Sequence, residues 1–214
     1  MGGAIAVHIA DQQLLPSMAA LAVIDVVEGS AKEALPEMAK FLKSRPVAFG
    51  STEDAISWAL KSGQTRNAAS ARVSMPMQLR PQTQDEGASA HVGAASGGGG
   101  TPVVAAAGSQ PRLTWKIDLA QTEPHWIGWF QGLSKKFLGS KVPKLLVLAG
   151  INTLDVELTV GQMQGKFQLA VIENVGHAVH EDAPGKVADI VVTFLARFKH
   201  VQKSAACGFY PPAC

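Results

Sequence analysis

What the sequence has little of narrows the classes of protein to which it can belong. Cysteine occurs only twice in 214 residues, as Cys207 and Cys214, so we expect no disulfide framework, and a reducing compartment fits the chain. Neither sign of charge is in excess, because 17 acidic residues nearly balance 19 basic ones, and nothing in this balance favours nucleic acid or anionic lipid as a partner. Long apolar runs are also missing, and no stretch is long enough to span a bilayer.

What is present describes a globular chain. Hydrophobic residues make up 47% and charged residues 17%, and 214 residues suffice for a compact domain with a sizeable core. The apolar stretch 1–10 lacks the basic start of a signal peptide and contains two glycines and His8, so we do not interpret it as one. We therefore expect a cytoplasmic or nuclear location.

Three continuous apolar runs predict strands that are buried on both faces, as in a parallel sheet. These runs are 21–27, 144–150 and 167–172. Small residues at 2–10 predict a helix that packs closely against a sheet. The stretch 184–199 predicts a helix with one apolar face, with Asp182 as its N-cap. The order of strands and helices predicts an α/β fold with a cap over one end of the sheet.

A long insertion, 29–142, separates the first two strands, so we expect core segments at 1–28 and 143–214 and a helical cap between them. Helices are predicted at 32–43 and after Ser51, where Ser51-Thr52-Glu53-Asp54 matches a capping box. The stretch 77–112 loses its periodicity and holds four consecutive glycines, so we expect a disordered loop there. The tryptophans are interpreted as part of the cap core.

Asp25 stands inside the first apolar run, where a carboxylate costs free energy unless it has a partner. The C-terminal ends of parallel strands are where α/β enzymes place their site residues. A strand-end aspartate that only caps a turn would give the same pattern. Asp155, which follows the second strand, competes with Asp25 for the same role, and its own alternative is the N-terminal acid of a helix. The residues alone leave this choice open.

His177 lies between the third strand and the last helix, in a loop from which a histidine can reach over the end of the sheet. A neutral imidazole oriented by a carboxylate can act there as a general base. The alternative is a helix-capping loop with two solvated histidines. His177 and His180 are three residues apart, but their order matches neither H-E-x-x-H nor H-x-x-E-H and no third ligand is evident, so we expect no metal site. The glycine run matches no phosphate loop.

Several long motifs, spread over nearly the whole chain, match one family. The first eight residues, M-G-G-A-I-A-V-H, look like the stretch directly after the serine in the nucleophile elbow G-H-S-M-G-G-A-I-A-V-H. Further matching runs are I-D-V-V-E-G at 24–29, A-R-V-S-M at 71–75, G-W-F at 128–130, G-Q-M-Q-G-K-F-Q at 161–168 and G-H-A-V-H-E-D-A-P at 176–184. On these motifs the chain resembles the C-terminal portion of protein phosphatase methylesterases, beginning just after the nucleophile serine.

The resemblance implies the later half of an α/β-hydrolase fold with a helical cap insertion. It also implies a carboxylesterase that removes the methyl ester from the C-terminal leucine of the type-2A protein phosphatase catalytic subunit, without a cofactor. The family's catalytic acid matches Asp25 and its histidine matches His177, which tips the choice away from Asp155. Met1, the residue after the serine, would be an oxyanion donor, whereas the serine itself matches no residue of the chain.

Because it lacks the nucleophile, we expect the chain as given to have no esterase activity, although the family is one of enzymes. Two alternatives stay open: an inactive fragment that binds the phosphatase, and an α/β-hydrolase that acts on another ester. Matches at Trp115, Trp129 and 162–168 favour the phosphatase as the partner, and no nucleic acid or membrane is expected.

Overall fold

The computed structural model of the chain describes residues 1–82, 112–150 and 154–198. They fall into two compact units. The sheet unit comprises Met1–Ala34 and the residues from Trp126 onward, and the insert unit comprises Leu35–His125. Among the described residues, no helix has both the length and the apolar character needed to cross a membrane.

The sheet unit contains three parallel strands in the order β1-β5-β6, namely β1 (Leu21–Ile24), β5 (Lys144–Leu148) and β6 (Gln168–Val171). Leu21 pairs with Lys144, and Leu145 pairs with Gln168. All three predicted strands are confirmed, and each ends before the predicted apolar run does. β1 ends because Asp25 adopts a φ of 51°, which lies outside the extended region of the backbone.

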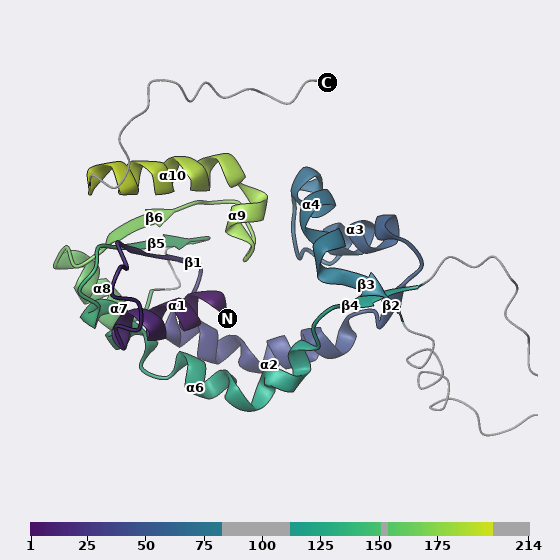
Figure 1. Cartoon of the computed structure of the whole chain (residues 1–214), viewed down its shortest axis with the longest axis horizontal. Helices are drawn as coiled ribbons and strands as arrows, with labels where there is room; N and C mark the ends of the chain where they lie inside the picture. The colour runs from purple at the N-terminus through teal and green to yellow at the C-terminus, as the bar shows by residue number, and fades with distance from the viewer. Residues whose placement is uncertain (83–111, 151–153, 199–214) are drawn as a thin grey trace, which may run out of the picture. The chain divides into compact units, whose positions relative to one another are not determined.

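Helices cover both faces of this sheet (Figure 1). The helices that lie wholly within the sheet unit are α1 (Gly2–Asp11), α6 (Trp126–Phe130), α7 (Leu133–Gly139), α8 (Val156–Met163), α9 (Val179–Asp182) and α10 (Pro184–Arg197). Leu145 and Val147 of β5 share a core cluster with Phe194 of α10. Leu146 points to the opposite face, where it lines a small apolar cavity with Val7 of α1. Because successive strand residues alternate between faces, a strand covered on both must be apolar along its covered length, as β5 is after Lys144, from Leu145 to Leu148.

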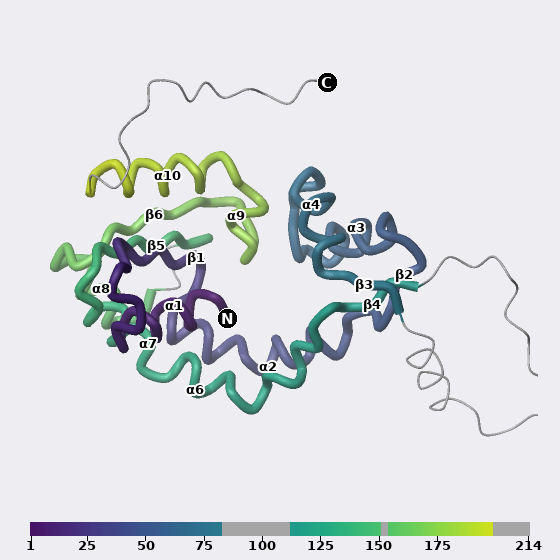
Figure 2. Tube along the Cα trace, viewed as in Figure 1, coloured from purple at the N-terminus to yellow at the C-terminus, as the bar shows by residue number. Residues whose placement is uncertain are grey.

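The predicted close packing of the first helix is confirmed at Gly3. A Cβ atom at this position would lie 3.0 Å from Cγ1 of Val23 and 3.1 Å from Cγ2 of Val26, so only glycine fits without displacing the strand. The Cα trace in Figure 2 shows the N-terminal end of α1 close to the end of β1. The small residues at the start of the chain thus bring α1 against the turn that carries Asp25.

The insert unit contains the part of α2 (Glu28–Ser44) from Leu35 onward, together with α3 (Thr52–Lys61), α4 (Ala68–Gln78) and the 3-10 helix η1 (Leu119–His125). Its antiparallel sheet has the order β2-β4-β3, with β2 (Ala48–Phe49), β4 (Leu113–Trp115) and β3 (Leu79–Pro81). Both predicted helices are confirmed, and Ser51 caps α3 by accepting a hydrogen bond from the backbone N–H of Asp54. Trp58 and Trp115 pack against the buried residues Phe49 and Met75.

Three predictions need correction. The loop predicted at 77–112 is wrong at its start, because α4 runs to Gln78 and Leu79–Pro81 is a strand; residues 83–111 lie outside the described part of the chain. The strand could not be predicted from local pattern because its partner, β4, is more than thirty positions away in the sequence. Trp126, which was predicted to belong to the cap core, is buried in the sheet unit. The predicted bounds of the cap, 29–142, stay a prediction.

The third correction concerns Asp182, which does not cap the last helix. Ala183 holds the N-cap position of α10 and provides no side-chain cap. Asp182 ends α9 instead, and its Oδ2 accepts a hydrogen bond from the backbone N–H of Gly176 at 2.6 Å. A carboxylate beside the last helix therefore closes the loop that carries His177.

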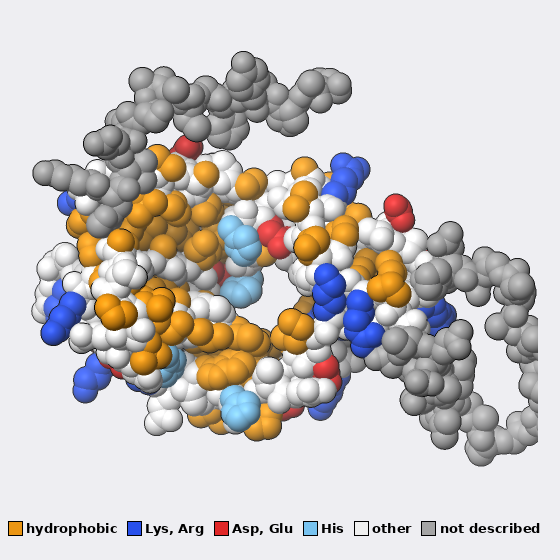
Figure 3. All heavy atoms as spheres, viewed as in Figure 1, with side chains coloured by type: hydrophobic (Ala, Val, Ile, Leu, Met, Phe, Trp, Pro, Cys, Tyr) orange, Lys and Arg blue, Asp and Glu red, His pale blue; other side chains and the backbone are white. Residues whose placement is uncertain are grey.

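On the face drawn in Figure 3, hydrophobic side chains gather over α10 and the sheet, and histidine side chains reach the surface.

Candidate active site

Asp25 is held at the carboxyl end of β1 by the neighbouring strand. Its backbone N–H donates to the carbonyl oxygen of Val147 at 2.7 Å, and its Oδ1 accepts from the backbone N–H of Ala149 at 2.9 Å. The side chain is 13% exposed, so the carboxylate is largely removed from water. Because Oδ1 is bound to the residue that follows β5, Oδ2 is the oxygen that faces away from this strand. The local structure therefore presents one carboxylate oxygen in a fixed direction.

His177 meets that oxygen. Its Nδ1 lies 2.8 Å from Oδ2 of Asp25, although 152 positions separate the two residues in the sequence. An ionised carboxylate can only accept hydrogen bonds, so Nδ1 of a neutral imidazole must be the donor, and the lone pair then resides on Nε2. The histidine side chain is 82% exposed, and within the described residues Nε2 has no hydrogen-bond partner. This tautomer with an open Nε2 is what general-base catalysis requires.

Asp155, the competing acid, is occupied by other groups. Its Oδ1 accepts from the backbone N–H of Leu158 at 2.8 Å, so it caps α8, as the alternative interpretation of the sequence proposed. Its Oδ2 accepts from the hydroxyl of Ser134 at 2.5 Å. Because both oxygens serve the starts of helices, the structure brings Asp25, and not Asp155, to His177.

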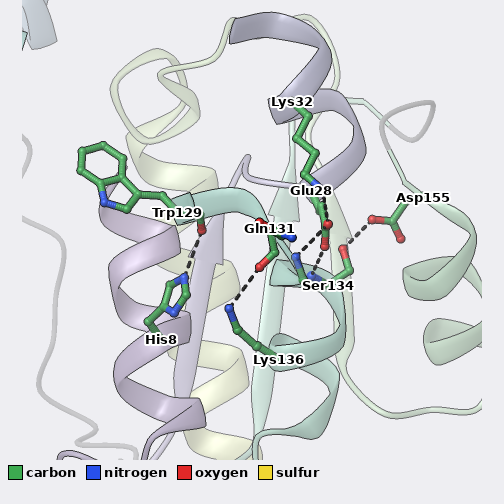
Figure 4. Close-up of polar contacts among 9 residues, drawn as sticks. His8, Glu28, Lys32, Trp129, Gln131, Ser134, Lys136 and Asp155 are labelled. Carbon is green, nitrogen blue, oxygen red and sulfur yellow. Dashed lines mark hydrogen bonds and ion pairs between the residues drawn. The ribbon is translucent and has the colours of Figure 1, made fainter. Parts of the chain in front are cut away.

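A polar network links Asp155 to the start of α2, as Figure 4 shows. Glu28 accepts from the backbone N–H of Gly132 at 2.9 Å through Oε1 and from that of Ser134 at 3.1 Å through Oε2. Nζ of Lys32 also donates to Oε1, at 2.5 Å. Desolvation raises the pKa of Glu28, but the hydrogen bonds from Lys32, Gly132 and Ser134 outweigh it and leave the pKa below its ordinary value.

Neither Glu28 nor Ser134 was predicted to be functional from the sequence. Glu28 belongs to the matched motif I-D-V-V-E-G, which also holds Asp25, and Ser134 follows Gly132. The signal available in the sequence was the position of Glu28, a carboxylate three residues after the strand-end Asp25. The partners of Glu28 could not be read from the sequence, because they are more than a hundred positions away.

Met1, the predicted oxyanion donor, occupies the N-cap position of α1 and is 43% exposed. Its carbonyl accepts from the backbone N–H of Ile5 at 3.1 Å, and partial burial lowers the pKa of its amino group. Through Gly3 this end of α1 lies beside the turn of Asp25. The role of Met1 in binding an oxyanion stays a prediction.

Among the described residues, the histidine that contacts Asp25 is His177 and not His180. His180 lies in α9 and is exposed. In the described ranges, no three His, Cys, Asp or Glu side chains are grouped so that they could hold a metal ion. The structure thus separates the two histidines of the loop, with one directed at a carboxylate and the other on a short helix.

Comparison with curated proteins gives a consistent result. The chain is 46% identical to protein phosphatase methylesterase 1 of Homo sapiens, over 100% of this chain and 60% of that protein. It is 48% identical to a probable protein phosphatase methylesterase 1 of Caenorhabditis elegans, over 99% of this chain and 51% of the relative. For the Schizosaccharomyces pombe protein the identity is 41%, over 92% of this chain and 50% of the relative. The chain thus spans between half and 60% of the length of these relatives.

Solved structures agree on the fold. An E-2-(acetamidomethylene)succinate hydrolase superposes with a TM-score of 0.65 at 15% identity, over 91% of this chain and 63% of that one. A peroxisomal α/β-hydrolase of Saccharomyces cerevisiae gives a TM-score of 0.59 at 11% identity, over 99% of this chain and 54% of that one. No model of a known protein family matches the chain.

The alignment with the human protein covers the turn of Asp25 and the loop of His177, and the structural likeness places both on part of an α/β-hydrolase fold. The resemblance found in the sequence is therefore confirmed, and over 92% to 100% of its length the chain is a homologue of proteins named protein phosphatase methylesterase 1.

Proposed function

We propose that the protein to which this chain belongs hydrolyses a carboxylic ester by the serine-hydrolase mechanism, with His177 as general base and Asp25 as the residue that orients it. The observation that carries this proposal is the 2.8 Å contact between Nδ1 of His177 and Oδ2 of Asp25 at the carboxyl end of a parallel strand. The names of the relatives support a protein methyl ester as the substrate class.

The chemistry assigned to these residues has two halves. A serine hydroxyl attacks the ester carbonyl while Nε2 of His177 takes its proton, and the resulting imidazolium then protonates the departing methanol. In the second half, His177 deprotonates a water molecule that attacks the acyl-enzyme, and the serine leaves with its proton restored. Throughout, Asp25 stays ionised and stabilises the charge on the ring. The nucleophile is proposed to come from outside the 214 residues, and the amide of Met1 to donate to the oxyanion.

The proposed substrate is the methyl ester on the C-terminal leucine of the type-2A protein phosphatase catalytic subunit, which would also be the binding partner. The supporting observation is that the identity to the named relatives covers 100% of this chain in the human comparison, and thus includes the insert unit as well as the sheet unit. No cofactor enters the proposed reaction. We propose a cytoplasmic or nuclear location for the protein.

The direct test is release of methanol from a peptide that ends in leucine methyl ester, measured with the whole protein and with its His177→Ala variant. We expect hydrolysis by the former only. Hydrolysis of small activated esters but not of the peptide would support the alternative of another substrate. Binding of the phosphatase without any turnover would support the alternative of an inactive binding protein.

A second test addresses the nucleophile. The 214-residue chain is incubated with a fluorophosphonate probe, which labels activated serines, and the labelled peptides are identified by mass spectrometry. We expect no labelled serine within this chain and one labelled serine upstream of it in the whole protein. A serine labelled within residues 1–214 would overturn the assignment of the nucleophile.

A further inference from the structure

The turn that carries Asp25 is held under backbone strain. Asp25 has a φ of 51°, in the left-handed region that non-glycine residues adopt at a cost of about 1 kcal/mol or more. Such a conformation persists only where the surroundings fix it. Val147 of β5 and Ala149, which follows this strand, fix the residue from one side. The other end of the turn, where α2 begins at Glu28, needs its own anchor.

Glu28 provides that anchor with both carboxylate oxygens. Gly132, the N-cap residue of α7, has a φ of 69° and no side chain with which to cap the helix. Oε1 of Glu28 accepts from its backbone N–H, and Oε2 accepts from that of Ser134. Glu28 therefore caps α7 from a distant part of the chain, as the close-up in Figure 4 shows. A bidentate contact of this kind fixes direction as well as distance.

The residues between the two anchors transmit this constraint. Only Val26 and Val27 separate Asp25 from Glu28, and Val27 is 2% exposed. Val26 lies against Gly3 at the start of α1. A movement of Glu28 would therefore shift Asp25 directly, with no flexible segment to absorb it.

We propose that Glu28 is a positioning residue for the pair formed by Asp25 and His177: its carboxylate, bound to the start of α7, holds the turn so that Oδ2 of Asp25 faces Nδ1 of His177. The inference rests on the proposed function of that pair. It predicts that loss of the Glu28 carboxylate releases His177 into the other tautomer, without contact between Glu28 and the histidine. It also predicts a loss of turnover with little change in substrate binding.

The test uses the whole protein with 15N-labelled histidine, at a pH where the imidazole is neutral. The ring nitrogen shifts report which nitrogen carries the proton. We expect the Nδ1–H form in the wild type, a shift toward the Nε2–H form in Glu28→Ala, and a smaller shift in Glu28→Gln, which keeps one acceptor oxygen. In parallel, kcat in Glu28→Ala should fall on the order of 10²-fold, the loss expected for a misplacement of about 1 Å, with KM nearly unchanged.

Two control variants separate positioning from general stability. Glu33→Gln changes an exposed carboxylate of the same helix and should leave the tautomer and kcat as they are. Ser134→Ala removes the hydroxyl that donates to Asp155 but keeps the backbone N–H that donates to Glu28. It should lower the unfolding temperature without changing the tautomer. If Ser134→Ala moved the tautomer as far as Glu28→Ala, or if neither moved it, the inference would be overturned.

A different experimental result would refute the proposed function itself. If wild-type His177 lacked the Nδ1–H form, or if Asp25→Asn left the tautomer unchanged, the pairing of Asp25 with His177 itself would be refuted. A wild-type Nδ1–H form that is lost in Asp25→Asn but retained in Glu28→Ala would refute only the role of Glu28. Should Glu28→Ala fail to fold, Glu28→Gln alone decides the question, because it preserves the size of the side chain.

Discussion

Asp25 and Asp155 follow neighbouring strands of one parallel sheet, yet they have opposite surroundings. Asp25 keeps one oxygen for the ring of His177, whereas Asp155 gives one oxygen to the start of α8 and the other to the hydroxyl of Ser134. Position after a strand is therefore not enough to identify a catalytic acid. An aspartate can serve as the catalytic acid only if the backbone and side-chain donors at the starts of neighbouring helices leave one of its oxygens available.

Hydrogen bonds through Ser134 link Asp155 to Glu28, three residues after Asp25. Ser134 donates its hydroxyl to Asp155 and its backbone N–H to Glu28, so it connects the acid that caps α8 to the acid that follows the turn of Asp25. The structural acid thus belongs to the framework around the proposed catalytic one. Variants at each position should separate these two roles.

The largest expected effect is at His177. His177→Ala in the whole protein should lower kcat on the order of 10⁶-fold, the loss found when the histidine of a serine-protease triad is removed. His180→Ala should leave most of the turnover, because its side chain lies on α9 and is not directed at Asp25. Steady-state hydrolysis measures both. Equal losses, with circular dichroism unchanged, would indicate a mechanism that uses two histidines.

The second effect compares the acids directly. Asp25→Asn should lower kcat by about 10⁴-fold, because an amide no longer selects the Nδ1–H tautomer. Asp155→Asn should retain activity, since asparagine still caps α8 and its NH2 can donate to the hydroxyl of Ser134; the expected loss is at most about 1 kcal/mol of stability. An inactive Asp155→Asn beside an active Asp25→Asn would reverse the assignment.

A smaller effect is expected where α1 meets the Asp25 turn. Gly3→Ala would place a methyl group 3.0 Å from Val23 and 3.1 Å from Val26, and should cost about 1–3 kcal/mol of unfolding free energy. Gly2→Ala is the matched control, because no atom of the described residues lies within 4 Å of its added Cβ, and it should be neutral or slightly stabilising. Chemical denaturation measures both. Equal stability of the two variants would show that the close approach at Gly3 is relieved without cost.

The smallest effect is the dependence of stability on pH at Glu28. Its pKa lies below the ordinary value of 4.5 in the folded protein, so its contribution is present above that value and is lost as the pH falls through the folded pKa. The difference in unfolding free energy between wild type and Glu28→Gln should therefore be largest near neutral pH and shrink below about pH 4. Denaturation at pH 7 and pH 3 checks this. A difference that grows on acidification would contradict the sign of the pKa shift.

Much of the sheet unit was predictable, because its signals are local. Continuous apolar runs predicted three parallel strands, and small residues predicted a helix packed against β1. The choice between Asp25 and Asp155 was not predictable from pattern. It depends on hydrogen bonds such as that from Ser134 to Asp155, across 21 positions, and only the resemblance to a family favoured Asp25 beforehand.

The insert unit was harder to predict. Its helices follow local rules, as the cap at Ser51 shows. β3 consists of three residues, and one of them is Pro81, which the sequence pattern does not associate with strands. Its pairing with β4 is set by the folded unit and not by the strand's own composition.

That pairing has a consequence for how the protein can vary. Gln82 donates its backbone N–H to the carbonyl of Arg112 at 2.7 Å, so the two ends of the intervening sequence are fixed side by side. The entropic cost of closing a connection between two paired strands grows only with the logarithm of the number of residues in it, at about 0.6 kcal/mol for each doubling. Lengthening or replacing the sequence between these residues should cost the fold little. We therefore expect insertions between β3 and β4 to be tolerated, both in natural variants and in engineered ones.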